Sequence, residues 1–143
     1  MTSQSASTIL VVDDYSDNRT LLSAWLRAKG FKVVEAQDGK EGVRQASRAH
    51  PDLILMDLAM PELDGVEATR QIRERMSFSK TPIFAITAYG TYDVTQDALA
   101  AGCNEVLAKP LDLESLLGKI HSALGDPGKS KCQPATNGQE DQP

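Results

Sequence analysis

The sequence predicts an α/β fold in which five strands alternate with five helices. Short apolar runs of strand character alternate along the chain with longer segments whose apolar residues recur every three or four positions. Glycine or proline separates most of these segments. Short apolar strands joined by helices are typical of a parallel sheet covered on both faces. We therefore expect a doubly wound, five-stranded parallel sheet of the (βα)5 type.

The first half of the chain contains three expected strands and two expected helices. Residues 8–12 are a short β-branched run, and residues 16–29 follow as a helix that a glycine closes. Four apolar side chains share one face of this helix: Leu21, Leu22, Trp25 and Leu26. Residues 32–35 are a second short strand, residues 39–50 a helix stopped by a proline, and residues 53–56 a fully apolar strand.

The second half repeats the alternation. Residues 64–76 have a helical apolar face, and residues 83–86 form the fourth strand after a proline. Residues 92–101 are a short helix closed by a glycine, and residues 105–108 are the fifth strand. Asp112 is placed to cap a last helix, which carries an apolar stripe and ends before the next glycine.

Size and composition exclude several classes of protein. The 143 residues suit one domain with a sizeable core, and the net charge of −5 argues against a basic nucleic-acid footprint. No apolar run approaches the roughly 20 residues of a membrane helix. The polar start lacks the charged and apolar regions of a secretory signal. We expect a soluble, cytoplasmic protein without direct nucleic-acid or membrane contact.

The composition also sets the expected boundaries of the domain. The segment of residues 1–7 is short and polar, so we expect a disordered N-terminus before a folded domain over residues 8–125. Residues 126–143 hold Pro, Gly, Gln, Asn and Lys without a large apolar residue. They cannot bury enough surface to offset the entropy lost on ordering, which predicts a disordered polar tail. A short docking peptide is the alternative for this tail.

The chain has two cysteines, Cys103 and Cys132, without a motif spacing. This usage indicates free thiols in a reducing compartment, and it matches no zinc pattern. A disulfide between the two is the alternative.

Reactive side chains stand at the ends of four expected strands. They are Asp13 and Asp14, Asp57, Thr87, and Lys109. The carboxyl ends of parallel strands meet at one edge of a sheet, and ligands of open α/β folds bind at that edge. Three carboxylates, one hydroxyl and one ammonium would then share a small pocket. This combination suits a divalent cation and a phosphoryl group.

The carboxylates favour a magnesium site beside a nucleophile. Asp13 and Asp14 repel each other unless a cation lies between them, and Mg²⁺ typically takes one or two carboxylates and several waters. An aspartate such as Asp57 can form an acyl phosphate while the metal neutralises phosphoryl oxygens. The alternatives are a helix N-cap for the first pair and a loop carboxylate bonded to backbone for Asp57. Calcium is disfavoured because too few oxygens are offered.

The hydroxyl and the ammonium complete the predicted pocket. Thr87 could bond a phosphoryl oxygen, although threonine is also simply a good strand former. Lys109 would act as a point charge on phosphate, and the alternative is a solvated surface lysine. A Lys-Pro bond can be cis, which would aim this ammonium across the pocket.

Four motifs occur in order along the chain. They are Val11-Val12-Asp13-Asp14, Met56-Asp57 with Met60-Pro61 and Asp64-Gly65, Thr87-Ala88, and Lys109-Pro110. With these motifs, the chain resembles the receiver domain of two-component response regulators over about residues 8–124. The resemblance implies a flavodoxin-like parallel sheet in the strand order 2-1-3-4-5.

The resemblance also implies roles for the site residues. Asp57 would accept a phosphoryl group from a histidine kinase or a histidine phosphotransfer protein. Mg²⁺ would be bound directly by Asp14, Asp57 and the main-chain oxygen of Ala59, and by Asp13 mainly through a metal-bound water. Thr87 and Lys109 would grip the phosphoryl group and report its presence.

The function implied is signalling rather than turnover of a separate substrate. The chain would catalyse its own phosphorylation and slow dephosphorylation, and so would not be an enzyme in the usual sense. Its shifted surface, roughly residues 92–124, would contact a downstream protein. The chain would be a monomer or a phosphorylation-dependent dimer.

One position departs from the family's switch, and two others bear on the lifetime of the acyl phosphate. Val106 stands where receivers commonly carry the tyrosine or phenylalanine of their switch, and Tyr89 and Tyr92 are the candidate substitutes. Ala59 and Tyr89 flank the route of the attacking water in this family, and the bulky ring could slow hydrolysis of the acyl phosphate.

We expect a stand-alone receiver, and four alternative functions compete with this expectation. The first alternative is a receiver module of a hybrid histidine kinase or phosphorelay, because the stretch 56–70 resembles receivers of that type. A phosphorylation-independent interaction module would lack a pocket residue, whereas this chain lacks none. A dehalogenase-type phosphohydrolase needs a second aspartate two positions after Asp57, where Ala59 stands. A Rossmann nucleotide site needs a glycine-rich loop directly after the first strand, and no such loop follows the first strand here.

Overall fold

The computed structural model describes residues 6–58, 64–75, 80–88 and 92–124. The strands are β1 (Thr8–Val12), β2 (Lys32–Ala36), β3 (Leu53–Asp57), β4 (Ile83–Thr87) and β5 (Glu105–Ala108). The helices are α1 (Ser16–Ala28), α2 (Gly39–Ala49), α3 (Gly65–Arg75), α4 (Tyr92–Ala101) and α5 (Leu113–Leu124). All strand pairs are parallel, and the sheet order is β2-β1-β3-β4-β5. The predicted (βα)5 fold and its strand order are confirmed.

The central strands are buried on both faces, as their apolar sequences require. All five residues of β3 and all five of β4 are buried. A strand covered on both sides loses the alternation of polar and apolar residues that one solvated face would impose. The two strands therefore hold Asp57 and Thr87, their last residues, at the border between the core and the sheet edge.

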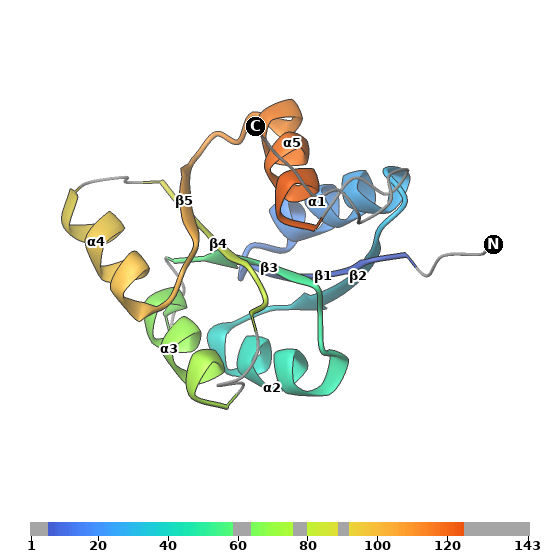
Figure 1. Ribbon diagram of the computed structural model, residues 1–143. Helices are drawn as coiled ribbons and strands as arrows, with labels where there is room; N and C mark the ends of the chain where they lie inside the picture. The colour runs from blue at the N-terminus through green and yellow to red at the C-terminus, as the bar shows by residue number, and fades with distance from the viewer. Residues whose placement is uncertain (1–5, 59–63, 76–79, 89–91, 125–143) are drawn as a thin grey trace, which may run out of the picture. The chain divides into compact units, whose positions relative to one another are not determined.

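Helices cover both faces of this sheet. Figure 1 shows α2 and α3 side by side below the strands and α1 above them. A single apolar cluster joins the sheet to the lower helices, and it includes Leu10, Val12, Ile54, Met56, Ile83, Ala85, Val43, Ala46, Ala68 and Ile72. Because side chains alternate along a strand, every second residue of β1, β3 and β4 contributes to this cluster.

Local signals set the ends of α2. The Asp38 side chain accepts a hydrogen bond from the Glu41 backbone N–H (2.8 Å), and Glu41 accepts one from the Gln37 N–H (3.1 Å). These bonds satisfy N–H groups that a helix start leaves without partners. The helix ends one residue earlier than predicted, because His50 adopts a left-handed conformation (φ 47°) directly before Pro51.

The prediction for the apolar face of α1 is wrong at one position. Leu26 is fully buried, whereas Leu21 is 71% exposed. The two residues lie five positions apart, which is about 140° around a helix, so one face cannot bury both well. The buried positions of this helix are Ser23 and Leu26.

The described residues up to Leu111 form one compact unit, and α5 belongs to a second. The Asp112 side chain accepts hydrogen bonds from the backbone N–H groups of Glu114 (3.2 Å) and Ser115 (3.5 Å). The predicted cap of the last helix is therefore confirmed. The expected tail over residues 126–143 lies outside the described residues, and the domain boundaries remain predictions. Within the described chain, no helix has the length and apolar character that crossing a membrane demands.

Candidate functional site

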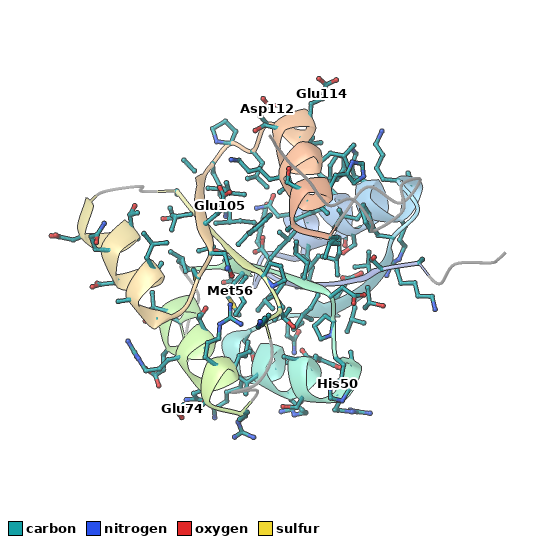
Figure 2. The ribbon with its side chains drawn as sticks, in the orientation of Figure 1. His50, Met56, Glu74, Glu105, Asp112 and Glu114 are labelled. Carbon is teal, nitrogen blue, oxygen red and sulfur yellow. The ribbon has the colours of Figure 1, made fainter. Side chains whose placement is uncertain are left out.

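The parallel register brings the reactive residues to one edge of the sheet. Val12 pairs with Met56, so Asp13 and Asp57 follow neighbouring positions of β1 and β3. In Figure 2, Met56 lies at the centre of the sheet, one residue before Asp57. On the other side, Thr87 at the end of β4 pairs with Ala108. The predicted assembly of these strand ends at one edge is confirmed.

Backbone hydrogen bonds continue the ladder beyond the strand ends. The Asp13 N–H donates to the Ala36 carbonyl (3.1 Å), and the Lys109 N–H donates to the Thr87 carbonyl (2.8 Å). The Leu58 N–H likewise donates to the Ile86 carbonyl (2.9 Å). The backbone that carries the reactive side chains is therefore as firmly paired as the sheet itself, which preorganises the site.

Three carboxylates form a cluster at this edge. One carboxylate oxygen from each of Asp13, Asp14 and Asp57 lies within 4.8 Å of the others. Asp13 and Asp57 are buried, and Asp14 is exposed. At an effective dielectric constant of about 20, two unit charges at such a separation repel by roughly 3 kcal/mol. Hard carboxylate oxygens gathered at this cost fit a divalent cation such as Mg²⁺.

The helix-cap alternative for the aspartate pair does not describe how α1 begins. Tyr15 is the N-cap residue, and its side chain makes no capping hydrogen bond. Asp13 Oδ1 accepts a hydrogen bond from the Tyr15 N–H (2.9 Å), which fixes the carboxylate before the helix starts. A carboxylate accepts several hydrogen bonds or ligand contacts through its two oxygens, so this bond leaves Asp13 with capacity for a metal ion or a water molecule.

Lys109 reaches the central carboxylate. Its Nζ lies 3.6 Å from Asp57 Oδ2, and the Lys109–Pro110 peptide bond is cis. The Asp57 side chain is 6% exposed and that of Lys109 is 31% exposed. The alternative of a solvated surface lysine is therefore excluded. An ammonium at this distance partly offsets the charge of a carboxylate that the core leaves poorly hydrated.

Thr87 is buried at the end of β4, beside the strand that carries Asp57. Asp57 pairs with Ile86, so the hydroxyl of Thr87 comes one residue beyond the carboxylate along the sheet. Since Lys109 follows β5 on the other side of β4, the three groups come from three adjacent strands. A group bound at Asp57 would meet a hydroxyl and an ammonium from the same side.

Two residues support the backbone of the site in ways that the sequence did not indicate. Arg19 was not predicted to belong to the site, and Gly65 was part of a motif without an assigned role. Arg19 Nη1 donates to the Asp13 carbonyl (2.8 Å), and Arg19 Nε donates to Glu35 on β2 (3.1 Å). A Cβ added to Gly65 would lie 2.3 Å from the Asp57 carbonyl oxygen. Neither contact has a local sequence signal, because each depends on distances between segments far apart in the chain.

Not every predicted position falls within the described residues. Ala59, the expected main-chain ligand, and Tyr89 lie outside the described residues. Val106 is half-buried and packs against the apolar cluster below the sheet. At this position the fold accepts a β-branched side chain as part of its core packing.

Comparisons with known proteins agree with this geometry. Residues 9–121 match the family model of the response regulator receiver domain. The chain is 30% identical over 118 residues to the polar-differentiation response regulator DivK of Brucella ovis, covering 82% of this chain and 96% of DivK. It is 35% identical over 116 residues to the regulatory protein AtoC of Escherichia coli K12, covering 81% of this chain but 25% of AtoC.

Solved structures give the same result. The fold is similar to the receiver domain of the sensor histidine kinase PA1611 from Pseudomonas aeruginosa PAO1, with a TM-score of 0.78 and 38% identity. This match covers 85% of the chain and 99% of that domain, which was solved with a magnesium ion coordinated in its active-site cleft. The family match spans most of the folded segment and contains every strand end described above. The chain therefore belongs to the response regulator receiver domain family.

Proposed function

We propose that this chain is a phospho-acceptor receiver that takes a phosphoryl group on Asp57 from a histidine kinase or histidine phosphotransfer protein. One observation carries the proposal. Asp57 is buried at the strand end, where oxygens of Asp13 and Asp14 lie within 4.8 Å of one of its own and the Lys109 ammonium lies 3.6 Å from its Oδ2. A carboxylate in this position can act as a nucleophile, because an ammonium group lies on one side of it and a candidate site for a divalent cation lies on the other.

The transfer needs little beyond positioning and charge neutralisation. An Asp57 carboxylate oxygen attacks phosphorus, a P–O bond forms, and the P–N bond to the donor phosphohistidine breaks. The second ring nitrogen of the donor phosphohistidine carries a proton, so the imidazole leaves as a neutral group and needs no acid from this chain. Mg²⁺, when bound, neutralises the phosphoryl oxygens. Asp13, Asp14 and Asp57 are the residues that would hold it, as their hard oxygen donors fit this ion.

Lys109 and Thr87 bind the product in this proposal. The ammonium already beside Asp57 would pair with a phosphoryl oxygen, and the Thr87 hydroxyl would donate to another. Both side chains start from backbone that is hydrogen-bonded between β4 and β5. Phosphorylation would therefore pull on the ends of these two strands, and α4 and β5 are the elements that would carry the change to a downstream protein.

The donor is proposed to approach over the start of α1. Tyr15 is 58% exposed and Leu21 is 71% exposed, and Tyr15 follows the aspartate pair directly. Exposed apolar side chains beside a reactive group are a suitable contact surface for a protein that must reach Asp57.

We further propose that the protein works as a single-domain regulator. Coverage of 96% of DivK supports this arrangement. The alternative, a module of a hybrid histidine kinase, is supported by the 38% identity to the PA1611 receiver domain. An antibody against this chain distinguishes the two, because a single-domain protein migrates near 15.5 kDa and a hybrid kinase migrates far above it.

Intact-mass analysis tests phosphoryl acceptance. The protein is incubated with a small acyl phosphate and Mg²⁺, beside an Asp57→Asn variant and a matched Asp97→Asn control on the exposed side of α4. We expect one added phosphate on the wild type and the control, and none on Asp57→Asn. Chelation of Mg²⁺ should stop the reaction. An adduct that persists in Asp57→Asn would overturn the assignment.

A further inference from the structure

The described chain contains a second polar feature, which lies on helices α2 and α3. A groove of about 420 Å³ lies between α2 and α3. Its lining residues are Lys40, Val43, Arg44, Ser47, Arg48, Gln71 and Arg75. Four of these seven carry positive charge, and none carries negative charge. The groove thus has a charge opposite to that of the whole chain, which is −5.

The basic side chains form a row. Lys40, Arg44 and Arg48 are spaced by four residues along α2, which places them on one face at steps of about 6 Å. Arg75, in the last turn of α3, contributes a fourth charge from across the groove. The ion pairs of the described residues involve other basic groups, namely Arg19, Arg27, Arg70 and Lys109, so within this part of the chain the row meets no carboxylate at ion-pair distance.

The acidic residues of α3 do not neutralise the row. Glu67 pairs with Arg70 and accepts a hydrogen bond from Gln71 (3.5 Å). Glu74 is labelled in Figure 2 at the outer edge of α3, and it is not among the residues that line the groove. Like charges spaced four residues apart on a helix destabilise it by a few tenths of a kcal/mol. An anionic occupant would remove that cost.

We propose that the groove between α2 and α3 binds an acidic helical segment of a partner protein. Glutamates at every fourth position of such a helix match the 6 Å steps of Lys40, Arg44 and Arg48. The floor of the groove is apolar at Val43, which suits the apolar residues of an amphipathic helix. An extended polyanion such as nucleic acid or an anionic membrane would also meet the remainder of the chain, which is more acidic than its total charge.

Fluorescence anisotropy tests the proposal with the full chain. The probe is a labelled amphipathic peptide with glutamate at every fourth position and leucine beside each, and a glutamine version is its control. The double variant Arg44→Glu/Arg48→Glu reverses the middle of the row, and Lys29→Glu/Lys32→Glu makes the same change in net charge outside it. We expect at least tenfold weaker binding for the first pair and less than a twofold change for the second.

A failure of peptide binding can be distinguished from a failure of phosphoryl acceptance. Both double variants should accept phosphate from a small donor at the wild-type rate, because neither touches the Asp57 site. Chemical-shift changes of backbone amides should map to α2 and α3. Equal loss of binding in both variants, or no binding at millimolar peptide, would overturn the proposal. Tighter binding of a single-stranded oligonucleotide or of anionic vesicles at the same residues would overturn the choice of a peptide.

Discussion

Gly65 is the point at which α3 contacts the end of β3, the strand that carries Asp57, and replacing it with alanine should disturb both. The Gly65 N–H donates to the Leu58 carbonyl (3.3 Å). An added Cβ would lie 2.3 Å from the Asp57 carbonyl oxygen and 2.8 Å from Leu58 Cα. Both obstacles are backbone atoms, so a side-chain rotation cannot relieve them. Among the described glycines only Gly30 and Gly102 have a positive φ. Gly65 is therefore required for lack of space and not for its backbone conformation.

The size of the effect follows from these distances. Ordinary van der Waals contact begins at 3.4 Å, so the start of α3 or the Asp57 carbonyl must move by about 1 Å. Overpacking of this kind typically costs about 1–3 kcal/mol of stability. A displacement of about 1 Å at a reacting group can cost about 10²-fold in rate. We therefore expect Gly65→Ala to fold with reduced stability and to accept phosphate about a hundredfold more slowly.

A control in the same helix separates these two effects. Ile72 is 1% exposed in α3, and Ile72→Val should cost about 0.5–1.5 kcal/mol without touching Asp57. Stability is measured by urea unfolding, and the phosphorylation rate by intact mass at a fixed concentration of a small acyl phosphate. The reasoning is refuted if Gly65→Ala is phosphorylated at the wild-type rate, or if Ile72→Val slows the reaction equally.

Three further predictions concern separate parts of the chain. Lys109→Met should lower the phosphorylation rate by about 10²-fold, as removal of one donor to a developing charge typically does, and an unchanged rate by intact mass would contradict the role of its contact with Asp57. Leu21→Glu should leave phosphorylation by a small acyl phosphate unchanged and slow transfer from a phosphohistidine protein. If the variant accepts phosphate from the phosphohistidine protein at the wild-type rate, α1 is not part of the docking surface. Burial raises the pKa of the Cys103 thiol above its ordinary value of 9.0, so the folded state holds its proton where the unfolded state ionises. Stability from this group should be complete below pH 9.0 and decline as pH rises towards the folded pKa, and in a Cys132→Ser background iodoacetamide should modify Cys103 far more slowly in native than in urea-unfolded protein.

The sequence contained enough information for the sheet and for most of its reactive edge. The apolar runs before Asp57 and Thr87 are short, nearly uniform and separated by helical periods, and such runs indicate parallel strands. Once strands are parallel, their carboxyl ends must meet. The proximity of Asp13, Asp57 and Lys109 then follows from topology, and the observed register agrees with it.

Contacts that depend on the path of a long side chain could not be predicted in this way. Arg19 is one of several charged residues at the start of α1, and nothing in the adjacent residues indicates that it bonds both the Asp13 carbonyl and Glu35. The exposure of Leu21 could not be predicted for a related reason. An apolar residue at the border of a helical face is buried only if a neighbouring element reaches it, and periodicity does not contain that information.

Helix α3 connects the parts of the site that the sequence presents separately. Its first residue, Gly65, contacts the backbone of Asp57, while Arg73 near its other end donates two hydrogen bonds to the Gly102 carbonyl (3.1 and 2.9 Å). Arg73 also donates to Asn104 Oδ1 (3.0 Å), which accepts the Ile83 N–H at the start of β4. Through these contacts one helix is fixed both to the strand that carries Asp57 and to the turn that leads into β5. A displacement of Asp57 that moved the start of α3 would therefore strain the entry to β4, which ends at Thr87, and to β5, which ends at Ala108 directly before Lys109. This provides a physical connection between Asp57 and the proposed output elements, although Val106 stands where receivers commonly carry an aromatic residue.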